Sequence, residues 1–373
     1  MSLEGWLADQ AAQREEAGLA RVLRPRAPRD DEIDLAGNDY LGLATDPRVS
    51  TAAAEAATTW GAGAAASRLV TGTLGLHVEL ERELAEFSGH SAALVFSTGY
   101  HANLGVVTAL ADRDTVIVSD AHVHASLVDA CRLGRGRVQV VPHNDVDAVA
   151  RALRGRAESR ALVLCESIYS VLGDAAPLAA LADVCRSHDA TLIADEAHGL
   201  GVAGRHGEGL VASLGLAGSP HVVVTMTLSK SLGAQGGAVL GSPALVQHLV
   251  NRARPFVYDT GLAPAAAGGA LEALRIVAAE PGLPARARAC ATTLADAVGV
   301  EPPAGAVLSV PMPGPREALA AQAELLESRL RVGCFRPPSV PDGVSRLRLT
   351  ASARVSGADL DDAAAVLAKV VAR

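Results

Sequence analysis

The stretch Thr191-Leu-Ile-Ala-Asp-Glu-Ala-His-Gly199 is a short apolar run that ends directly in an acidic pair and a histidine. An apolar run of this length without polar alternation is typical of a strand that is buried on both faces, as in a parallel sheet. Ligands of open parallel sheets bind beyond the carboxyl ends of the strands. Asp195 and His198, which follow the predicted strand, are therefore candidates for a binding or catalytic site.

Similar apolar runs alternate with segments of helical length, such as 145–153 and 177–188, through the middle of the chain. Because parallel strands need long crossover connections, this alternation predicts an α/β fold with a mostly parallel central sheet sandwiched by helices. A further short strand is expected to close at Val239 after a glycine-rich turn. The other predicted strands are Ala92–Ser97, Thr115–Ser119, Val138–Val141, Ala161–Cys165, Thr191–Ala194 and His221–Thr225.

The chain is long for one compact core, and its pattern predicts three regions. We expect an amphipathic N-terminal helix and a basic arm over residues 1–45, a large domain over residues 46–275, and a small α+β domain over residues 276–373. The large domain is expected to end near a helix over residues 263–279. The predicted strands of the small domain are Val307–Val310 and Arg346–Thr350, and its two predicted helices are Arg316–Arg331 and Gly357–Val370.

Composition excludes several classes of protein. The formal charge of −8 argues against a general nucleic-acid surface. No apolar stretch reaches the roughly 18–20 residues that a membrane span needs, and the N-terminus does not resemble a signal peptide. The five cysteines form no CxxC pair, which favours reduced thiols and a cytoplasmic location. Abundant alanine and glycine, with only 3% aromatic residues, predict close packing of helices on the sheet.

Five predicted strands deliver chemically useful residues to the same edge of the sheet. Any one of these groups alone is more simply read as an ordinary turn, but all five together favour a functional site. They are an anion-binding turn at Thr98-Gly99-Tyr100, a histidine at His124, a carboxylate–serine pair at Glu166-Ser167, the Asp195-x-x-His198 pair, and a lysine at Lys230.

Two other motifs are typical of a dinucleotide site and of a metal site, but each lacks the residues that usually accompany it. Gly199-Leu-Gly-Val-Ala-Gly204 matches a dinucleotide-binding loop, yet no helix is expected after it and Thr225 stands where a ribose-binding acid belongs. His122-x-His124 lacks a third ligand at a recurring spacing, so we expect no metal site.

An ordered series of motifs resembles the α-oxoamine synthases, a family of fold-type I enzymes that use pyridoxal 5′-phosphate (PLP). The resemblance covers nearly the whole chain, from Asn38 to Thr350. Its most specific segments are His124-Ala-Ser126, Glu166-Ser-Ile-Tyr-Ser-Val-Leu-Gly-Asp-Ala-Ala-Pro177, Asp195-Glu-Ala-His-Gly199 and Thr227-Leu-Ser-Lys230.

The resemblance implies a PLP site with defined roles. Lys230 is expected to hold PLP as a Schiff base and to move protons, and Asp195 to keep the pyridine nitrogen protonated so that the ring withdraws electrons. His124 is expected to stack on the ring. The other implied contacts are His198 and Ser170 near the phenolic oxygen, Gly99, Tyr100 and Thr227 at the phosphate, Thr260 at a phosphate across a homodimer interface, and Arg21, Asn38 and Arg348 on the substrates.

The activity implied is that of a PLP-dependent acyltransferase, in which an amino acid condenses with an acyl thioester and loses CO₂. Arg336-Pro-Pro resembles the biotin-pathway branch that joins L-alanine to pimeloyl-CoA or a pimeloyl carrier protein. The segment Ser67–Thr73 is closer to glycine-using branches, so a glycine C-acetyltransferase, a 5-aminolevulinate synthase or a sphingoid-base synthase remains an alternative. Outside the family, the alternatives are an aminotransferase or lyase of the same fold and a cofactor-free binding protein.

Overall fold

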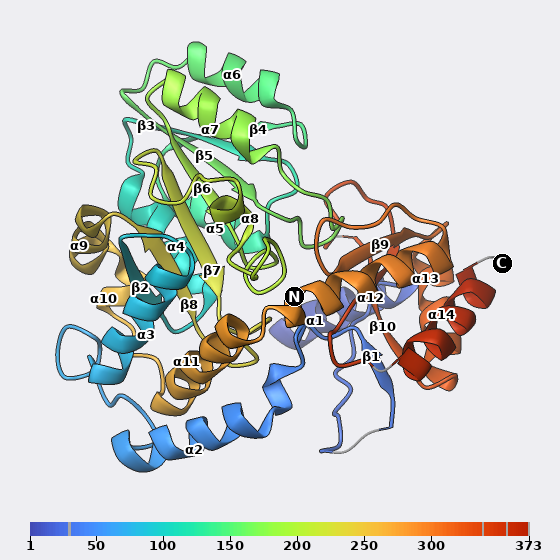
Figure 1. Cartoon of the computed structure of the whole chain (residues 1–373). Helices are drawn as coiled ribbons and strands as arrows, with labels where there is room; N and C mark the ends of the chain where they lie inside the picture. Colours follow the sequence, from blue (N-terminus) through green and yellow to red (C-terminus); the bar gives the residue numbers. More distant parts are fainter. Residues whose placement is uncertain (29–30, 338, 356, 372–373) are drawn as a thin grey trace.

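The strands form two separate sheets in the computed structural model, which describes residues 1–28, 31–337, 339–355 and 357–371 (Figure 1). In the seven-stranded sheet only β8 runs antiparallel to its neighbours, which confirms the predicted mostly parallel α/β sheet. The predicted strand ends agree with the observed ones to within two residues. The order across the sheet is β2 (Ala92–Phe96), β8 (Gly237–Gly241), β7 (Val222–Thr227), β6 (Thr191–Asp195), β5 (Arg160–Glu166), β3 (Thr115–Asp120) and β4 (Arg137–Val141).

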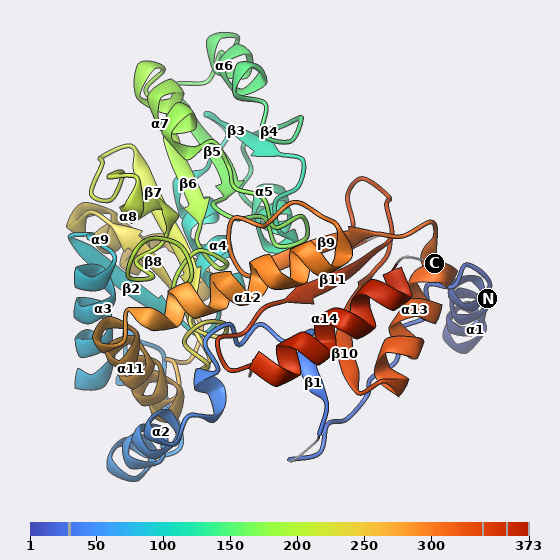
Figure 2. The same ribbon diagram turned by 45° about the vertical axis from the view of Figure 1, so that its right-hand side comes forward.

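Helices cover both faces of this sheet (Figures 1 and 2). Successive side chains of a strand point to opposite faces, so Leu94 and Phe96 join one apolar core and Val95 joins the other. The core of Leu94 contains helices α4 (Gly99–Leu110), α5 (Ala125–Leu133), α9 (Pro243–Arg252) and α10 (Arg254–Val257). The core of Val95 contains α2 (Pro47–Trp60), α3 (Gly75–Phe87), α6 (Val146–Arg154), α7 (Leu178–Ser187), α8 (Leu210–Ser213) and α11 (Pro264–Ala279).

Small residues let the helices approach the sheet closely, as the composition predicted. Gly105 of α4 lies against the ring of Phe96 on β2, and a Cβ at position 105 would lie 2.7 Å from that ring. Any larger side chain at this position would force α4 away from the sheet. This close approach matters for function because the N-terminus of α4 borders the candidate site.

The second sheet combines both ends of the chain, in the order β1 (Ile33–Leu35), β10 (Leu330–Phe335), β11 (Arg346–Thr350) and β9 (Val307–Pro311). Three helices pack beside it: α12 (Gly282–Val298), α13 (Pro315–Glu327) and α14 (Gly357–Val371) (Figure 2). The sequence prediction missed α12, β1 and β10. The helix predicted for residues 316–331 was too long, because the chain turns at Arg329, which has a φ of 62°, and β10 begins at the next residue.

The N-terminal helix α1 (Leu3–Glu16) exists as predicted, but it buries no residue within the chain, and Trp6 remains 50% exposed. Between β1 and α2 lies the short helix η1 (Leu43–Thr45). Within the described residues, no helix is both long enough and apolar enough to cross a membrane.

Candidate active site

A cavity of about 250 Å³ lies at the carboxyl ends of the central strands. It is the place where the sequence predicted a site, because the strand order brings the ends of β6 and β7 beside the start of α4. Seven of the predicted site residues line this cavity: Gly99, Tyr100, His124, Asp195, His198, Thr227 and Lys230.

Lys230 ends a chain of hydrogen bonds that reaches the N-terminal segment. Its Nζ lies 2.9 Å from Nε2 of His198, and Nδ1 of His198 lies 2.7 Å from the hydroxyl of Tyr40. The Tyr40 hydroxyl donates to Oδ1 of Asn38, at 3.0 Å, so its oxygen accepts the Nδ1 proton of His198. Nε2 of His198 is then unprotonated and accepts a hydrogen bond from the Lys230 amine.

Burial shifts the pKa values of these three side chains, because a charged group is costly away from water. Burial lowers the pKa of Lys230 to about 8, although the carboxylates of Asp195 and Glu166 oppose that change. Burial, followed by the nearby Lys230, lowers the pKa of His198 well below its usual value, which agrees with a neutral ring. Burial also raises the pKa of Tyr40 to about 12, so its hydroxyl keeps its proton.

Asp195 is fixed by two hydrogen bonds at the end of β6. Oδ1 accepts from the Ala197 amide at 2.9 Å, and Oδ2 accepts from Nδ2 of Asn103 at 2.7 Å. Asn103 is itself oriented, because its Oδ1 accepts from the Thr225 hydroxyl at 2.6 Å and its Nδ2 also donates to Ser126. The carboxylate is therefore held rigidly at the wall of the cavity.

His124 caps the N-terminus of α5 through its ring. Nδ1 accepts a hydrogen bond from the Ser126 amide at 3.2 Å and lies 2.8 Å from the Ser126 hydroxyl. Burial lowers the pKa of His124, so the ring is favoured in its neutral form. The ring lines the cavity with a fixed orientation, whereas its stacking on a cofactor remains a prediction.

The part of the cavity wall at the start of α4 has the chemistry of an anion site. Gly99 and Tyr100 begin α4, and Thr98 caps it by accepting a hydrogen bond from the His101 amide at 3.0 Å. Thr227 lies so close to this helix start that a Cβ on Gly99 would be 3.0 Å from its side chain. Free amides at a helix N-terminus together with hydroxyl groups suit a phosphate. The chemistry of this lining therefore fits PLP: Gly99, Tyr100 and Thr227 could hold its phosphate, and Asp195 and Lys230 its ring.

Arg348, Asn38 and Ser170 lie beside the cavity and not in its lining. The buried guanidinium of Arg348 donates through Nε to the Ser170 carbonyl at 2.6 Å, and through both terminal nitrogens to Oδ1 of Asn38 at 3.1 Å. Ser170 in turn donates its amide to Glu166 at 2.9 Å and its hydroxyl to the same carboxylate at 3.3 Å. The Ser170 hydroxyl is thus paired with Glu166.

The structure does not bring Thr260 or Arg21 into the cavity of a single chain. Thr260 forms an antiparallel bridge with Ser67 and lines a separate, much smaller pocket. Arg21 is exposed and donates to the hydroxyl of Ser339 at 2.7 Å, so the N-terminal arm lies against the segment after β10. Pro338, part of the Arg-Pro-Pro segment, lies outside the described residues.

Glu166 was expected at this edge of the sheet without an individual role, whereas Asn103, Ser126 and Tyr40 were not expected at the site. Asn103, Ser126 and Glu166 line the cavity, and Tyr40 contacts His198. One signal was available for Asn103: it lies four residues after Gly99, and residues at this spacing share one face of a helix. Tyr40 gave no such signal, because its partner is more than 150 positions away.

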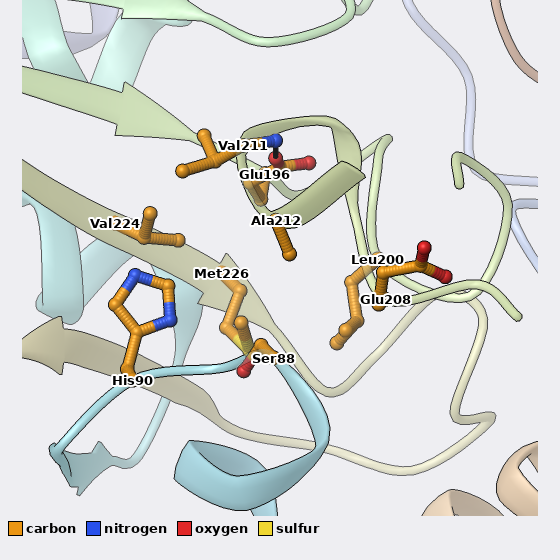
Figure 3. Close-up of a pocket in the computed structure, with 9 residues that line it drawn as sticks. All are labelled: Ser88, His90, Glu196, Leu200, Glu208, Val211, Ala212, Val224 and Met226. Atoms are coloured by element: carbon orange, nitrogen blue, oxygen red, sulfur yellow. Dashed lines mark hydrogen bonds between the residues drawn. The ribbon is translucent and has the colours of Figure 1, made fainter. Parts of the chain in front are cut away.

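The two acidic residues at the end of β6 have different surroundings. Asp195 lines the cavity, whereas Glu196 lies in a closed pocket near Val211 and Leu200 (Figure 3). Glu196 accepts hydrogen bonds from the Val211 amide at 2.6 Å and from the Ser167 hydroxyl at 2.8 Å. Its pocket has no room for a bound molecule, so Glu196 holds the surrounding loops in place.

Comparisons with known proteins agree with this geometry. The family model of aminotransferase class I and II matches residues 30–367, and the chain belongs to this family. It is 55% identical to the 8-amino-7-oxononanoate synthase of Mycolicibacterium gilvum (strain PYR-GCK), over 99% of the chain and 97% of that protein. It is 56% identical to the enzyme of the same name from Mycobacterium leprae (strain Br4923), over 98% and 95% of the two chains.

Solved structures show the same fold. A serine palmitoyltransferase from S. paucimobilis with a bound PLP–myriocin aldimine superposes with a TM-score of 0.90 at 28% identity, over 99% of this chain and 98% of that one. The predicted membership of the α-oxoamine synthases and the predicted PLP cofactor are confirmed.

Proposed function

We propose that this chain catalyses the decarboxylative condensation of L-alanine with pimeloyl-CoA, or with a pimeloyl carrier protein, to give 8-amino-7-oxononanoate, the free thiol and CO₂. One observation carries the proposal: a cavity that combines Lys230, Asp195, His124 and His198 lies in a chain 55% identical to an 8-amino-7-oxononanoate synthase over nearly its full length. Such a reaction places the chain in biotin biosynthesis.

Each group at the cavity has a part in this reaction. Bound PLP supplies an electron sink that stabilises negative charge on the α-carbon of the amino acid. Asp195, fixed by Asn103, holds a proton on the pyridine nitrogen. Lys230 is the group that takes the α-proton and later returns one, because its amine is neutral in part near pH 8. His198 keeps that amine directed into the cavity through its unprotonated Nε2.

Arg348 is the proposed group for the substrate carboxylate. Its planar guanidinium can give two charge-assisted hydrogen bonds to a carboxylate. The Ser170 carbonyl and Asn38 hold it in a single orientation, so little side-chain entropy is lost when the substrate binds. Arg21, on the exposed N-terminal arm, is proposed to contact the acyl substrate.

A homodimer completes the proposed enzyme. The apolar side chains of Leu69, Val70 and Tyr258 are 51%, 75% and 72% exposed, and they flank the bridge between Ser67 and Thr260. Exposed apolar patches of this kind mark interaction surfaces. A second copy seated there would bring Thr260 to the neighbouring phosphate site.

We also propose that the protein is cytoplasmic. The chain is proposed to divide into an N-terminal arm, a large domain and a small domain, with boundaries near residues 45 and 275.

Release of free thiol tests the proposed function directly. The purified protein, loaded with PLP, is incubated with L-alanine, glycine or L-serine in combination with pimeloyl-, acetyl-, succinyl- or palmitoyl-CoA. We expect thiol release to be fastest with L-alanine and pimeloyl-CoA, and the product to be 8-amino-7-oxononanoate by mass spectrometry. Faster turnover of another pair would replace the proposed substrates, and consumption of an oxo acid without thiol release would indicate an aminotransferase.

A further inference from the structure

His143 bridges two carboxylates at the edge of the sheet beside the active site. Its Nδ1 lies 3.0 Å from Oδ1 of Asp120 at the end of β3, and its Nε2 lies 2.9 Å from Oδ2 of Asp174 in the loop after β5. Nothing in the proposed reaction uses this imidazole. It follows β4 by two residues, at the turn Pro142-His143-Asn144.

The geometry favours protons on both ring nitrogens, because each has a carboxylate oxygen within 3.0 Å. The side-chain amide of Asn144, 3.3 Å from Nε2, makes its shorter hydrogen bond to Asp174, at 2.9 Å. A neutral imidazole has one N–H, and its other nitrogen would face carboxylate lone pairs without a proton between them. Asp120 is itself ionised, because it also accepts from the amides of His122 and Asn144 at 2.7 and 2.8 Å. Burial opposes a charge on His143, yet the hydrogen bonds to Asp120 and Asp174 raise its pKa to about 9.

The imidazolium contacts both sides of a tight loop over residues 169–174, here called the Ser170 loop. Asp174 pairs with one ring nitrogen, and the ring of Tyr169 packs edge-on against the imidazole at a centroid distance of 4.3 Å. The Tyr169 amide donates to the Asp174 carbonyl at 2.9 Å, which closes the loop on itself. Ser170, one of the four residues between Tyr169 and Asp174, presents the carbonyl that receives Nε of Arg348.

The other charged and titratable groups near His143 are His122, the ion pair of Asp342 and Arg346, and Tyr169. The ring of His122 lies 4.5 Å away between centroids, and His122 in turn faces the ion pair of Asp342 and Arg346. Tyr169 keeps its proton, because burial and the nearby negative charges raise its pKa far above its usual value. The two carboxylates are therefore the groups that set the charge of His143.

We propose that His143 is a positioning residue for the amino-acid substrate: as a cation between Asp120 and Asp174 it locks the Ser170 loop, and through the Ser170 carbonyl it fixes the guanidinium of Arg348 for the substrate carboxylate. This inference rests on the proposed function, in which Arg348 recognises that carboxylate. It assigns a role in binding selectivity to a side chain that lies outside the cavity lining.

Two probes separate this role from a general structural one. L-Alanine and L-alaninamide share the amine and the methyl group, but only L-alanine has a carboxylate. Dissociation constants of both are measured by absorbance titration of the PLP-loaded protein, for the parent chain, His143→Gln and Asp174→Asn. We expect both variants to weaken L-alanine about tenfold and L-alaninamide less than twofold, because only the group that faces the carboxylate has lost its orientation.

Matched controls and one independent readout complete the test. Asp183→Asn and His206→Gln make the same chemical changes at exposed positions and should leave both constants unchanged. Arg348→Lys should reproduce the selective loss. Equal weakening of both probes, or no weakening in either variant, would overturn the proposal. If His143→Gln does not fold, Asp174→Asn decides the outcome.

The proposed function can fail separately. A parent chain that shows no preference for L-alanine over L-alaninamide contradicts the role of Arg348 and not the charge of His143. That charge is measured in the cofactor-free protein by ¹⁵N NMR of its histidines at pH 8, where we expect protons on both ring nitrogens of His143. A ring with one proton would overturn the proposal that a charged His143 holds the Ser170 loop.

Discussion

The side-chain nitrogen of Lys230 lies 2.9 Å from Nε2 of His198, and the other nitrogen of that imidazole is held by the hydroxyl of Tyr40. Lys230, on the turn after β7, is therefore oriented through His198 by Tyr40 from the N-terminal segment. This relation explains why a lysine with several rotatable bonds can act at one point of the cavity. It also makes Lys230 the natural first target for experiments.

We expect borohydride treatment of the PLP-loaded protein to attach a pyridoxyl label to Lys230. The assignment is unusually clean because the sequence contains only two lysines, Lys230 and Lys369. Peptide mass spectrometry locates the label. Lys230→Ala should retain the fold and bind PLP reversibly, while condensation falls by about 10²–10⁴-fold, as for loss of a general acid–base group. A label on Lys369 would contradict the assignment, and Lys369→Ala is the control.

The pH dependence of cofactor capture follows from the burial of Lys230. Only a neutral amine attacks an aldehyde, and burial lowers the pKa of Lys230 to about 8. The rate at which cofactor-free protein captures PLP should therefore rise with pH, with a midpoint near 8, and reach a plateau well below pH 10. Stopped-flow absorbance measures this rate. A rate that still rises steeply between pH 9 and 10 would show that the amine is not perturbed.

Asp195→Asn should slow α-proton removal while leaving the fold intact. The amide cannot hold a positive charge on the pyridine nitrogen, so the developing negative charge at the α-carbon loses its stabilisation. A loss of about 10³-fold, or roughly 4 kcal/mol, is expected. Exchange of the α-proton of L-alanine in D₂O, followed by NMR, isolates this step. Asn103→Ala should cause a smaller loss by freeing the carboxylate, and Glu196→Gln should leave the exchange rate nearly unchanged.

The sequence predicted the large sheet well because each strand carries a local signal. Buried parallel strands are apolar on both faces, so Thr191–Asp195 and its neighbours stand out as short runs between helices. The residues that follow such strands must meet at one edge, which is why seven predicted site residues share the cavity. In this part of the chain, the residues that follow a locally recognisable strand are also the residues that meet in the folded protein.

Other parts of the molecule depend on contacts that no local pattern reveals. β1 has only three residues and is a strand because it pairs with β10, nearly 300 positions later. β10 itself follows α13 after a turn at Arg329, and its first two residues, Leu330 and Arg331, were predicted to be the end of a helix. Tyr40, Asn38 and Arg348 likewise meet only after the two ends of the chain have joined in the second sheet.

Thr260→Ala should weaken PLP binding by about tenfold, as expected for loss of one hydrogen bond to a charged group, if a second copy supplies this hydroxyl. Mixing this variant with Lys230→Ala creates one intact site in each mixed dimer, which combines Lys230 of one chain with Thr260 of the other. At limiting PLP, the mixture should therefore show more condensation activity than Thr260→Ala alone or Lys230→Ala alone. Thr59→Ala, at an exposed position of α2, is the control. A chain that is active as a monomer in sedimentation experiments would contradict the shared site.

His90 should make the protein less stable in acid. Its ring is 8% exposed between Ser88, Val224 and Met226 (Figure 3), and neither ring nitrogen forms a hydrogen bond of normal geometry within the described residues. Burial lowers the pKa of His90, and the Ser88 backbone offsets this only in part.

The unfolded chain therefore binds a proton at His90 at a higher pH than the folded chain does. The free energy of unfolding should fall as the pH drops below about 6.5 and the unfolded state gains that proton. Replacing the ring by an apolar side chain, as in His90→Leu, should remove this part of the pH dependence and add about 1 kcal/mol of stability at pH 5.5. Urea unfolding of the cofactor-free protein at pH 7.5 and 5.5 measures both effects, with His206→Leu, at an exposed position, as the control. An identical loss of stability on acidification in the parent and in His90→Leu would mean that other groups control it.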